Sequence, residues 1–150
     1  MPAEFRERIS WVPILTKNRR YRAAFTSNVV QNVGVVRRGI AGFAADCGFP
    51  QHAVDDIKLA SGEAISNAVE HGSAQRARRI TVDCSFDGRA IVVIVRDEGV
   101  GFPAPAETCA VVPDARGRGF GIFLMRRLMD EVSFERNGTV VRLVRSLDRD

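Results

Sequence analysis

The residues best suited to chemistry occur in a stretch where polar side chains recur every four positions. Glu63, Asn67 and His71 follow this spacing, and residues four apart share one face of an α-helix. A carboxylate one turn from a carboxamide can hold a hydrated Mg²⁺ ion, which prefers oxygen ligands and keeps several waters. The same carboxylate could accept a proton from a hydroxyl group. The alternative interpretation is the solvated face of an amphipathic helix.

A second candidate follows the apolar run 90–95, which is typical of a buried strand. Asp97, Gly99, Gly101 and Phe102 come directly after this run. A carboxylate fixed at a strand end can accept a hydrogen bond from an exocyclic amine such as N6 of adenine. Glycines let the backbone pass close to a flat base, because no Cβ stands in the way. The alternative interpretation is a turn that serves only the fold, because such a turn would have the same composition.

The third candidate is a glycine-rich segment, which is followed by a predicted helix. Gly117, Gly119 and Gly121 alternate with other residues, and Arg116 and Arg118 lie among them. Exposed backbone N–H groups beside a helix N-terminus suit a polyphosphate, and the arginines could contact its β- and γ-phosphates. The segment is not a dinucleotide fingerprint, because it follows a loop. It also lacks the Gly-Lys-Ser/Thr ending of a Walker loop.

Apolar periodicity and turn residues predict the elements that would position these segments. The predicted helices span 28–47, 49–72 and 119–129, and the predicted strands span 9–15, 22–25, 80–86, 90–95, 132–136 and 140–144. Asp87-Gly88 and Asn137-Gly138 are hairpin signals. Residues 102–116 contain three prolines and are predicted to form a long loop, which in compact domains usually serves a function such as a lid.

The order of these elements predicts an α+β fold. We expect a two-layer sandwich with helices on one face of a mixed, mainly antiparallel sheet. The 150 residues are expected to form a single domain, 1–150, in which residues 1–20 are an N-terminal extension.

Composition narrows the function classes. The chain is 45% hydrophobic and 27% charged, as in ordinary soluble proteins. It has neither a stretch of roughly 20 apolar residues nor a signal-peptide core, so we expect a cytoplasmic protein without a membrane partner. The net charge of +4 suits phosphates or an acidic partner, and no zinc pattern or aromatic ladder indicates direct nucleic-acid binding. Cys47, Cys84 and Cys109 are interpreted as buried thiols in a reducing compartment.

In this order, the three segments strongly resemble the GHKL (histidine-kinase-like) ATPase superfamily and its Bergerat ATP-binding fold. The resemblance rests on Glu-x-x-x-Asn-Ala-x-x-His, Asp-x-Gly-x-Gly-Phe and Gly-x-Gly-x-Gly-Ile-x-Leu, and it covers residues 22–146. It implies ATP and Mg²⁺ as cofactors, with Asn67 as the Mg²⁺ ligand and Asp97 reading the adenine. Thr139 corresponds to a family threonine that lies near the adenine. The implied ATP-binding residues are Asn67, His71, Asp97, Gly99, Gly101, Phe102, Arg116, Gly117, Arg118, Gly119, Gly121 and Thr139.

Within that superfamily, the sequence most resembles bacterial anti-sigma factors that are also serine kinases. The stretch 61–72 is similar to the group's motif, with one extra glycine, and a helix precedes the Asn-bearing helix as in that group. The resemblance implies that Glu63 is the general base for a serine of an anti-anti-sigma (STAS-type) partner. It also implies capture of a sigma factor and a homodimer formed through the sheet and first helix. Arg37 falls where the family has a partner-contacting arginine, although an ordinary exposed helix arginine is the alternative.

Two other functions remain as alternatives. The first is a non-catalytic, partner-binding regulatory module in which nucleotide serves structure or dimerisation only. The second is a histidine-kinase fragment, which is disfavoured because no dimerising helix pair with a phosphoacceptor histidine precedes the domain. His52 and His71 are the only histidines, and His71 is expected to line the site or the helix end.

Overall fold

The computed structural model describes residues 9–12, 18–26, 31–72, 79–98 and 120–149, and for residues 9–12, 31, 71 and 72 it describes the backbone alone. These ranges contain six strands and three helices. The strands are β1 (Ile9–Val12), β2 (Arg19–Thr26), β3 (Arg79–Phe86), β4 (Ala90–Asp97), β5 (Glu131–Glu135) and β6 (Val140–Ser146). The helices are α2 (Gln31–Asp46), α3 (Gln51–Gly72) and α4 (Phe120–Leu128).

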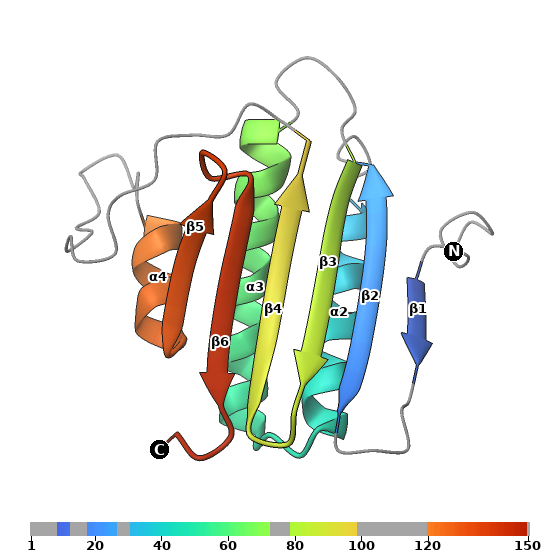
Figure 1. Ribbon diagram of the computed structural model, residues 1–150, viewed down its shortest axis with the longest axis vertical. Coiled ribbons are helices and arrows are strands. Elements are labelled where there is room, and N and C mark those ends of the chain that lie inside the picture. Colours follow the sequence, from blue (N-terminus) through green and yellow to red (C-terminus); the bar gives the residue numbers. More distant parts are fainter. Residues whose placement is uncertain (1–8, 13–17, 27–30, 73–78, 99–119, 150) are drawn as a thin grey trace.

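The strands form one sheet in the order β1-β2-β3-β4-β6-β5, and all three described helices lie on the same face of it (Figure 1). Each pair of neighbouring strands is antiparallel. The predicted two-layer α+β sandwich is therefore confirmed. Its sheet was expected to be mixed and mainly antiparallel, and among the described strands it is antiparallel throughout.

Side chains of the central strands alternate between a helix-covered face and a face that no described element covers. This period of two is the expected pattern for a sheet with one buried face. The buried residues of the central strands β3 and β4 are Ile80, Val82, Cys84, Phe86, Ile91, Val93 and Val95. The helical layer rests on this apolar surface. The apolar run of β4 is almost continuous because Val92 and Ile94, on the opposite face, are apolar as well.

Helix α3 packs against α2, α4 and the two strands β4 and β6. Ile57, Ala60, Ala64 and Ile65 on its inner face are completely buried. Two of these four residues are alanines, and small side chains let a helix approach its neighbours closely in a tightly packed interior. The helix that carries Glu63 and Asn67 is thus fixed by the core on one side.

A close contact also holds α2 against β2. A Cβ atom built on Gly39 would lie 2.1 Å from the hydroxyl oxygen of Tyr21, so glycine is required for this approach. Burial raises the pKa of the Tyr21 hydroxyl above its ordinary value.

The structure extends four of the predicted strands, of which β3 gains only one residue, Arg79. β2 begins at Arg19, inside the region assigned to the N-terminal extension, because its ladder with β3 continues to Arg19. β4 and β6 likewise continue to Asp97 and Ser146. In α4, which packs against α3 and β5, Met125 is the buried residue and Phe120 is 49% exposed.

Both predicted hairpin turns are present. Between β3 and β4, Oδ1 of Asp87 accepts hydrogen bonds from the backbone N–H groups of Arg89 (2.8 Å) and Ala90 (2.9 Å). Both bonds lower the pKa of the Asp87 carboxyl, and the bond from the Ala90 N–H has the larger effect. Gly88 has a φ of 94°, which favours glycine at this position. No described helix is long and apolar enough to cross a membrane.

Candidate functional site

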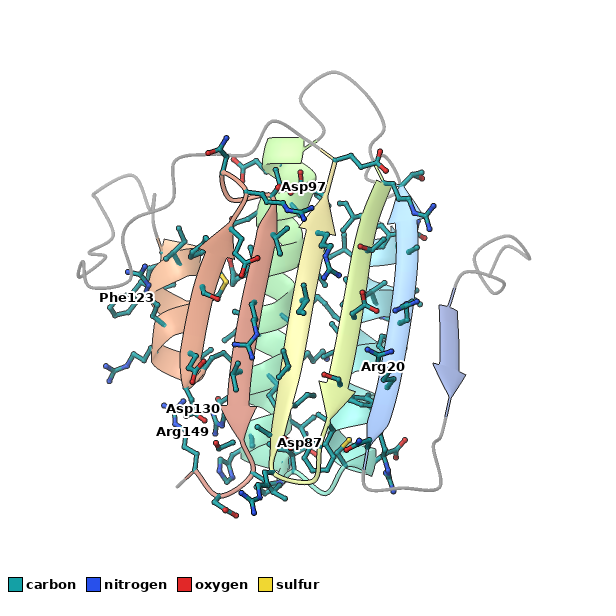
Figure 2. All side chains as sticks on the ribbon, viewed as in Figure 1. Arg20, Asp87, Asp97, Phe123, Asp130 and Arg149 are labelled. Carbon is teal, nitrogen blue, oxygen red and sulfur yellow. The ribbon has the colours of Figure 1, made fainter. Side chains whose placement is uncertain are left out.

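The described residues of the three sequence motifs lie toward one edge of the sheet. α3 and β4 are in contact and run in the same direction, so their C-terminal ends lie at the same edge (Figure 1). Figure 2 shows Asp97 at this end of β4. α4 packs against α3, and its chain direction brings its N-terminal half toward the same edge. Three elements that are distant in sequence therefore border one region.

Glu63 of the first motif lies close to Gly121 of the third motif. A Cβ atom built on Gly121 would lie only 2.8 Å from Oε2 of Glu63, so a residue with a side chain would displace the carboxylate. The Glu63 side chain is half-buried, as is Asn67 one turn further along α3. Glu63 therefore lies beside the first turn of α4, where backbone N–H groups lack helical partners, and Asn67 shares its helix face.

Asp97 and Thr139 join the second motif to the β5–β6 turn. The backbone N–H of Asp97 donates a 2.9 Å hydrogen bond to the carbonyl oxygen of Thr139. The Thr139 hydroxyl donates in turn to the carbonyl oxygen of Arg136, at 2.7 Å. Arg136, Asn137 and Gly138 have φ values of 51°, 57° and 80°. This left-handed turn ends β5 at Glu135 and places Thr139 beside the end of β4.

The remaining predicted site residues lie outside the described part of the chain. They are Gly99, Gly101, Phe102, Arg116, Gly117, Arg118, Gly119 and the side chain of His71. Of the predicted ATP-binding and catalytic set, the structure thus places Glu63, Asn67, Asp97, Gly121 and Thr139. Glu63 lies against Gly121, and Asp97 is hydrogen-bonded to Thr139. Glu63 and Asn67 share one face of α3.

Comparison with known proteins gives the family. The chain matches the model of the histidine kinase-like ATPase domain over residues 25–145. It is 30% identical over 130 residues to the serine-protein kinase RsbW of Bacillus pumilus, which covers 79% of this chain and 80% of that protein. The chain belongs to the histidine kinase-like ATPase family. The family resemblance drawn from the three motifs is thereby confirmed.

Two further relatives carry similar names. A serine-protein kinase RsbW of Halalkalibacterium halodurans is 32% identical over 129 residues, covering 79% of this chain and 78% of that protein. An anti-sigma F factor of Clostridium novyi is 29% identical over 125 residues, covering 78% and 87% respectively. The similarity thus extends over most of each chain.

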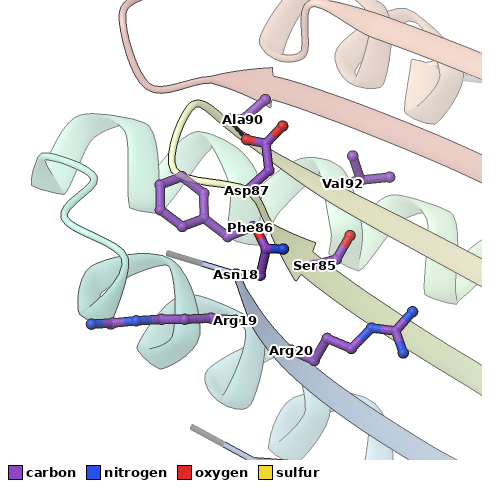
Figure 3. A pocket seen from close by; sticks show the side chains of 8 residues that line it. All are labelled: Asn18, Arg19, Arg20, Ser85, Phe86, Asp87, Ala90 and Val92. Atoms are coloured by element: carbon purple, nitrogen blue, oxygen red, sulfur yellow. Dashed lines mark hydrogen bonds between the residues drawn. The ribbon is translucent and has the colours of Figure 1, made fainter. Parts of the chain in front are cut away.

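A pocket lies at the edge of the sheet opposite the motif residues. It has a volume of about 430 Å³ and is lined by Asn18, Arg19, Arg20, Ser85, Phe86, Asp87, Ala90 and Val92 (Figure 3). Ala90 begins β4 and Asp97 ends it, so roughly 23 Å of strand separates this pocket from the motif residues. It contains none of the predicted site residues.

Sequence reasoning missed a charged cluster that fixes the far end of α4. Arg145 is 2% exposed, and its Nη1 lies 3.1 Å from Oδ2 of Asp56 on α3. The same nitrogen donates to the carbonyl oxygen of Leu128, and Arg149 donates to this oxygen at 2.9 Å. Cations are favourable at helix C-termini. The sequence contained a signal for the burial of Arg145, because this residue continues the period-two series of Val141 and Leu143.

The structure also places Arg37, the predicted partner-binding residue. It lies on α2 and is half-buried rather than an ordinary exposed arginine. Its side chain lies against Gly62 of α3, the glycine that departs from the family motif.

Proposed function

We propose that this protein is an ATP-dependent serine kinase that phosphorylates an anti-anti-sigma partner and sequesters a sigma factor. The main support is the contact between Glu63 and Gly121, because it sets a carboxylate beside the start of a helix that suits a polyphosphate. The names of the relatives point in the same direction. We further infer a cytoplasmic location and a homodimer.

In the proposed reaction, the serine hydroxyl of the partner attacks the γ-phosphorus of ATP. The new Ser–O–P bond forms as the bond to the β-phosphate oxygen breaks, and ADP leaves. Glu63 accepts the serine proton. Such a transfer depends mainly on positioning and charge stabilisation, which the glycine-rich segment, Arg116 and Arg118 would supply.

The other site residues would bind and orient the nucleotide. The Asp97 carboxylate would accept a hydrogen bond from N6 of adenine, with Thr139 alongside. Asn67 offers an oxygen ligand that fits Mg²⁺ with several retained waters, and the ion would neutralise phosphate charge. His71, Gly99, Gly101 and Phe102 complete the proposed ATP site.

The homodimer would use the uncovered face of the sheet together with α2. Three apolar residues of β4 and β6 lie half-buried on this face: Val92, Ile94 and Val144. The buried residues of the same strands point to the opposite face, toward the helices. Arg22 and Arg96 share the carboxylate of Asp83 at 2.5 and 3.0 Å. An apolar centre with charged neighbours is the usual composition of a protein interface.

The proposal is tested by incubating the protein with Mg-ATP and a purified anti-anti-sigma domain. We expect phosphate on a serine of that domain and saturable ATP binding in calorimetry. Asp97→Asn should weaken ATP binding by about tenfold or more, because loss of one charge-assisted hydrogen bond costs about 1.5–3 kcal/mol. ATP binding without transfer to any candidate domain would instead establish the non-catalytic module. Absence of ATP binding by folded protein would refute both.

Gly121→Ala provides a second test at the contact with Glu63. The new Cβ would displace the carboxylate, and a misplacement of about 1 Å can reduce a reaction about 100-fold. We therefore expect transfer to fall at least about tenfold. Stability should change little, since overpacking (about 1–3 kcal/mol) opposes the helix-propensity gain of about 1 kcal/mol.

Gly42→Ala is the matched control, because a Cβ on Gly42 has no neighbour within 4 Å. It should stabilise the protein by up to about 1 kcal/mol and leave transfer unchanged. Wild-type transfer rates in Gly121→Ala would show that Glu63 does not depend on this contact.

A further inference from the structure

The pocket at the end of the sheet distant from the motif residues lies on the uncovered face. Its volume of about 430 Å³ is in the range of small-ligand pockets. Arg20 of β2 pairs with Ser85 of β3, and Ser85 pairs with Val92 of β4, so these three residues form one row across three strands. A second row of lining residues, each two positions from a member of the first, borders it toward the β3–β4 turn: Asn18, Asp87 and Ala90.

Opposite charges stand on the two sides of this pocket. Figure 3 shows the Arg20 guanidinium group and the Asp87 carboxylate apart from each other, with Ser85 and Asn18 between them. Asp87 lies two residues beyond Ser85, the cross-strand partner of Arg20. Diagonal neighbours of this kind are about 7–8 Å apart, within reach of a long side chain. The ion pairs of the described residues nevertheless include none between Arg20 and Asp87.

Other arginines of this face have carboxylate partners. Arg22 lies 2.5 Å from Asp83, and Arg142 lies 3.4 Å from Glu131. The guanidinium group of Arg20, in contrast, forms no ion pair or hydrogen bond with a residue that the structure describes. The pocket therefore has a cation whose donors are free for a ligand.

The carboxylate of Asp87 is fixed by its turn and keeps its charge. Its Oδ1 accepts the backbone N–H groups of Arg89 and Ala90. These bonds lower the pKa of the carboxyl, so the group is ionised at neutral pH. No ion pair within the described ranges uses its Oδ2. The pocket thus presents a fixed anion as well as a free cation.

We propose that this pocket binds a small zwitterion of the class of a free aliphatic α-amino acid. Arg20 offers the ligand carboxylate a planar fork of N–H donors, and Asp87 accepts hydrogen bonds from the ligand ammonium group. Val92 contacts the aliphatic side chain. A simple anion would meet the Asp87 carboxylate and a simple cation would meet Arg20, so a ligand with both charges fits the pocket best.

This site is separate from the proposed kinase site. Ala90 begins β4 and Asp97 ends it, so roughly 23 Å of strand lies between the two sites. Val92 also belongs to the apolar centre of the proposed dimer face, and the amino acid would therefore lie at the margin of that interface. Its binding can be measured without nucleotide and without a protein substrate.

The test titrates the isotope-labelled full chain with each of the common aliphatic amino acids, followed through its backbone amide NMR signals. We expect saturable shifts for residues 18–20 and 85–92 with one or more of them, while the signals of Asp97 and Gly121 stay in place. Two derivatives of the amino acid that binds serve as matched ligands. Its N-acetyl form lacks the ammonium group and its amide lacks the carboxylate, so each should bind about tenfold more weakly or worse.

Variants of the two charged residues test the same contacts from the side of the protein. Arg20→Ala and Asp87→Asn should each weaken binding about tenfold or more, and asparagine keeps an oxygen acceptor for the turn. Arg89→Ala is the matched control, because Arg89 is an exposed arginine of the same turn that does not line the pocket. Its affinity should change less than about twofold. Melting temperatures without ligand check that every variant is folded.

Three results would overturn the proposed site. The first is the absence of a saturable shift with every amino acid tested. The second is undiminished affinity for the N-acetyl form, which would establish a simple anion site. The third is an equal loss in Arg20→Ala and Arg89→Ala, which would indicate general charge attraction. None of them bears on the kinase function, and a protein without kinase activity could still bind the amino acid.

Discussion

Glu63→Gln is expected to reduce serine phosphorylation by about 10²–10⁴-fold, the usual contribution of a general base. The amide keeps the size of the carboxylate, so the close approach of this side chain to Gly121 is preserved. The amide cannot accept the serine proton. Because Glu63 would act on the incoming hydroxyl and not on the adenine, the affinity for ATP should stay within a few-fold of the wild-type value. Single-turnover transfer and calorimetry with Mg-ATP measure the two quantities separately.

Glu70→Gln is the matched control, since Glu70 is an exposed carboxylate two turns further along the same helix. Its transfer rate should equal that of the wild-type protein. If Glu63→Gln transfers phosphate at the wild-type rate, Glu63 is not the base. If both transfer and ATP affinity fall together, Glu63 acts in binding, for example by holding Mg²⁺ together with Asn67.

Periodicity and turn residues were sufficient to predict the layers of the fold. α3 shows apolar residues at helical spacing, and Asp87-Gly88 shows the turn chemistry of a hairpin, so both were found from local sequence. The ends of the strands were harder to predict from the sequence. β2 and β6 extend through Arg19 and Arg145 because hydrogen-bonded ladders continue there, and ladder length depends on the neighbouring strand rather than on the residues themselves.

The order of motifs predicted the segments of the candidate site, whereas the structure supplied the contacts among its described residues. Nothing in the spacing indicated that Gly121 gives room to Glu63, because the two residues lie on different helices and meet only through packing. The same holds for Gly62 and Arg37. Glycine roles of this kind follow from the distance between two packed elements, which is a property of the whole fold.

Arg145→Met is expected to lower the free energy of unfolding by about 3 kcal/mol, at the lower end for breaking a buried ion pair. Arg145 is 3% exposed in its side chain and Asp56 is 32% exposed, so Asp56 can partly recover its hydration. The variant also removes a cation from the C-terminal end of α4, where Arg145 donates to the Leu128 carbonyl oxygen. Urea denaturation monitored by circular dichroism measures the change.

Arg149→Met is the control for a general charge effect, because Arg149 also donates to the α4 carbonyls at Leu128 and Arg127. Its side chain is 32% exposed, so its loss should cost at most about 1 kcal/mol. Replacing both partners, in Arg145→Met/Asp56→Ala, should recover part of the loss, because no unpaired carboxylate then remains. A stability increase in Arg145→Met alone would show that burying the guanidinium group costs more free energy than its contacts with α3 and α4 contribute. In that case α4 is held by the packing of Met125 and Met129 instead.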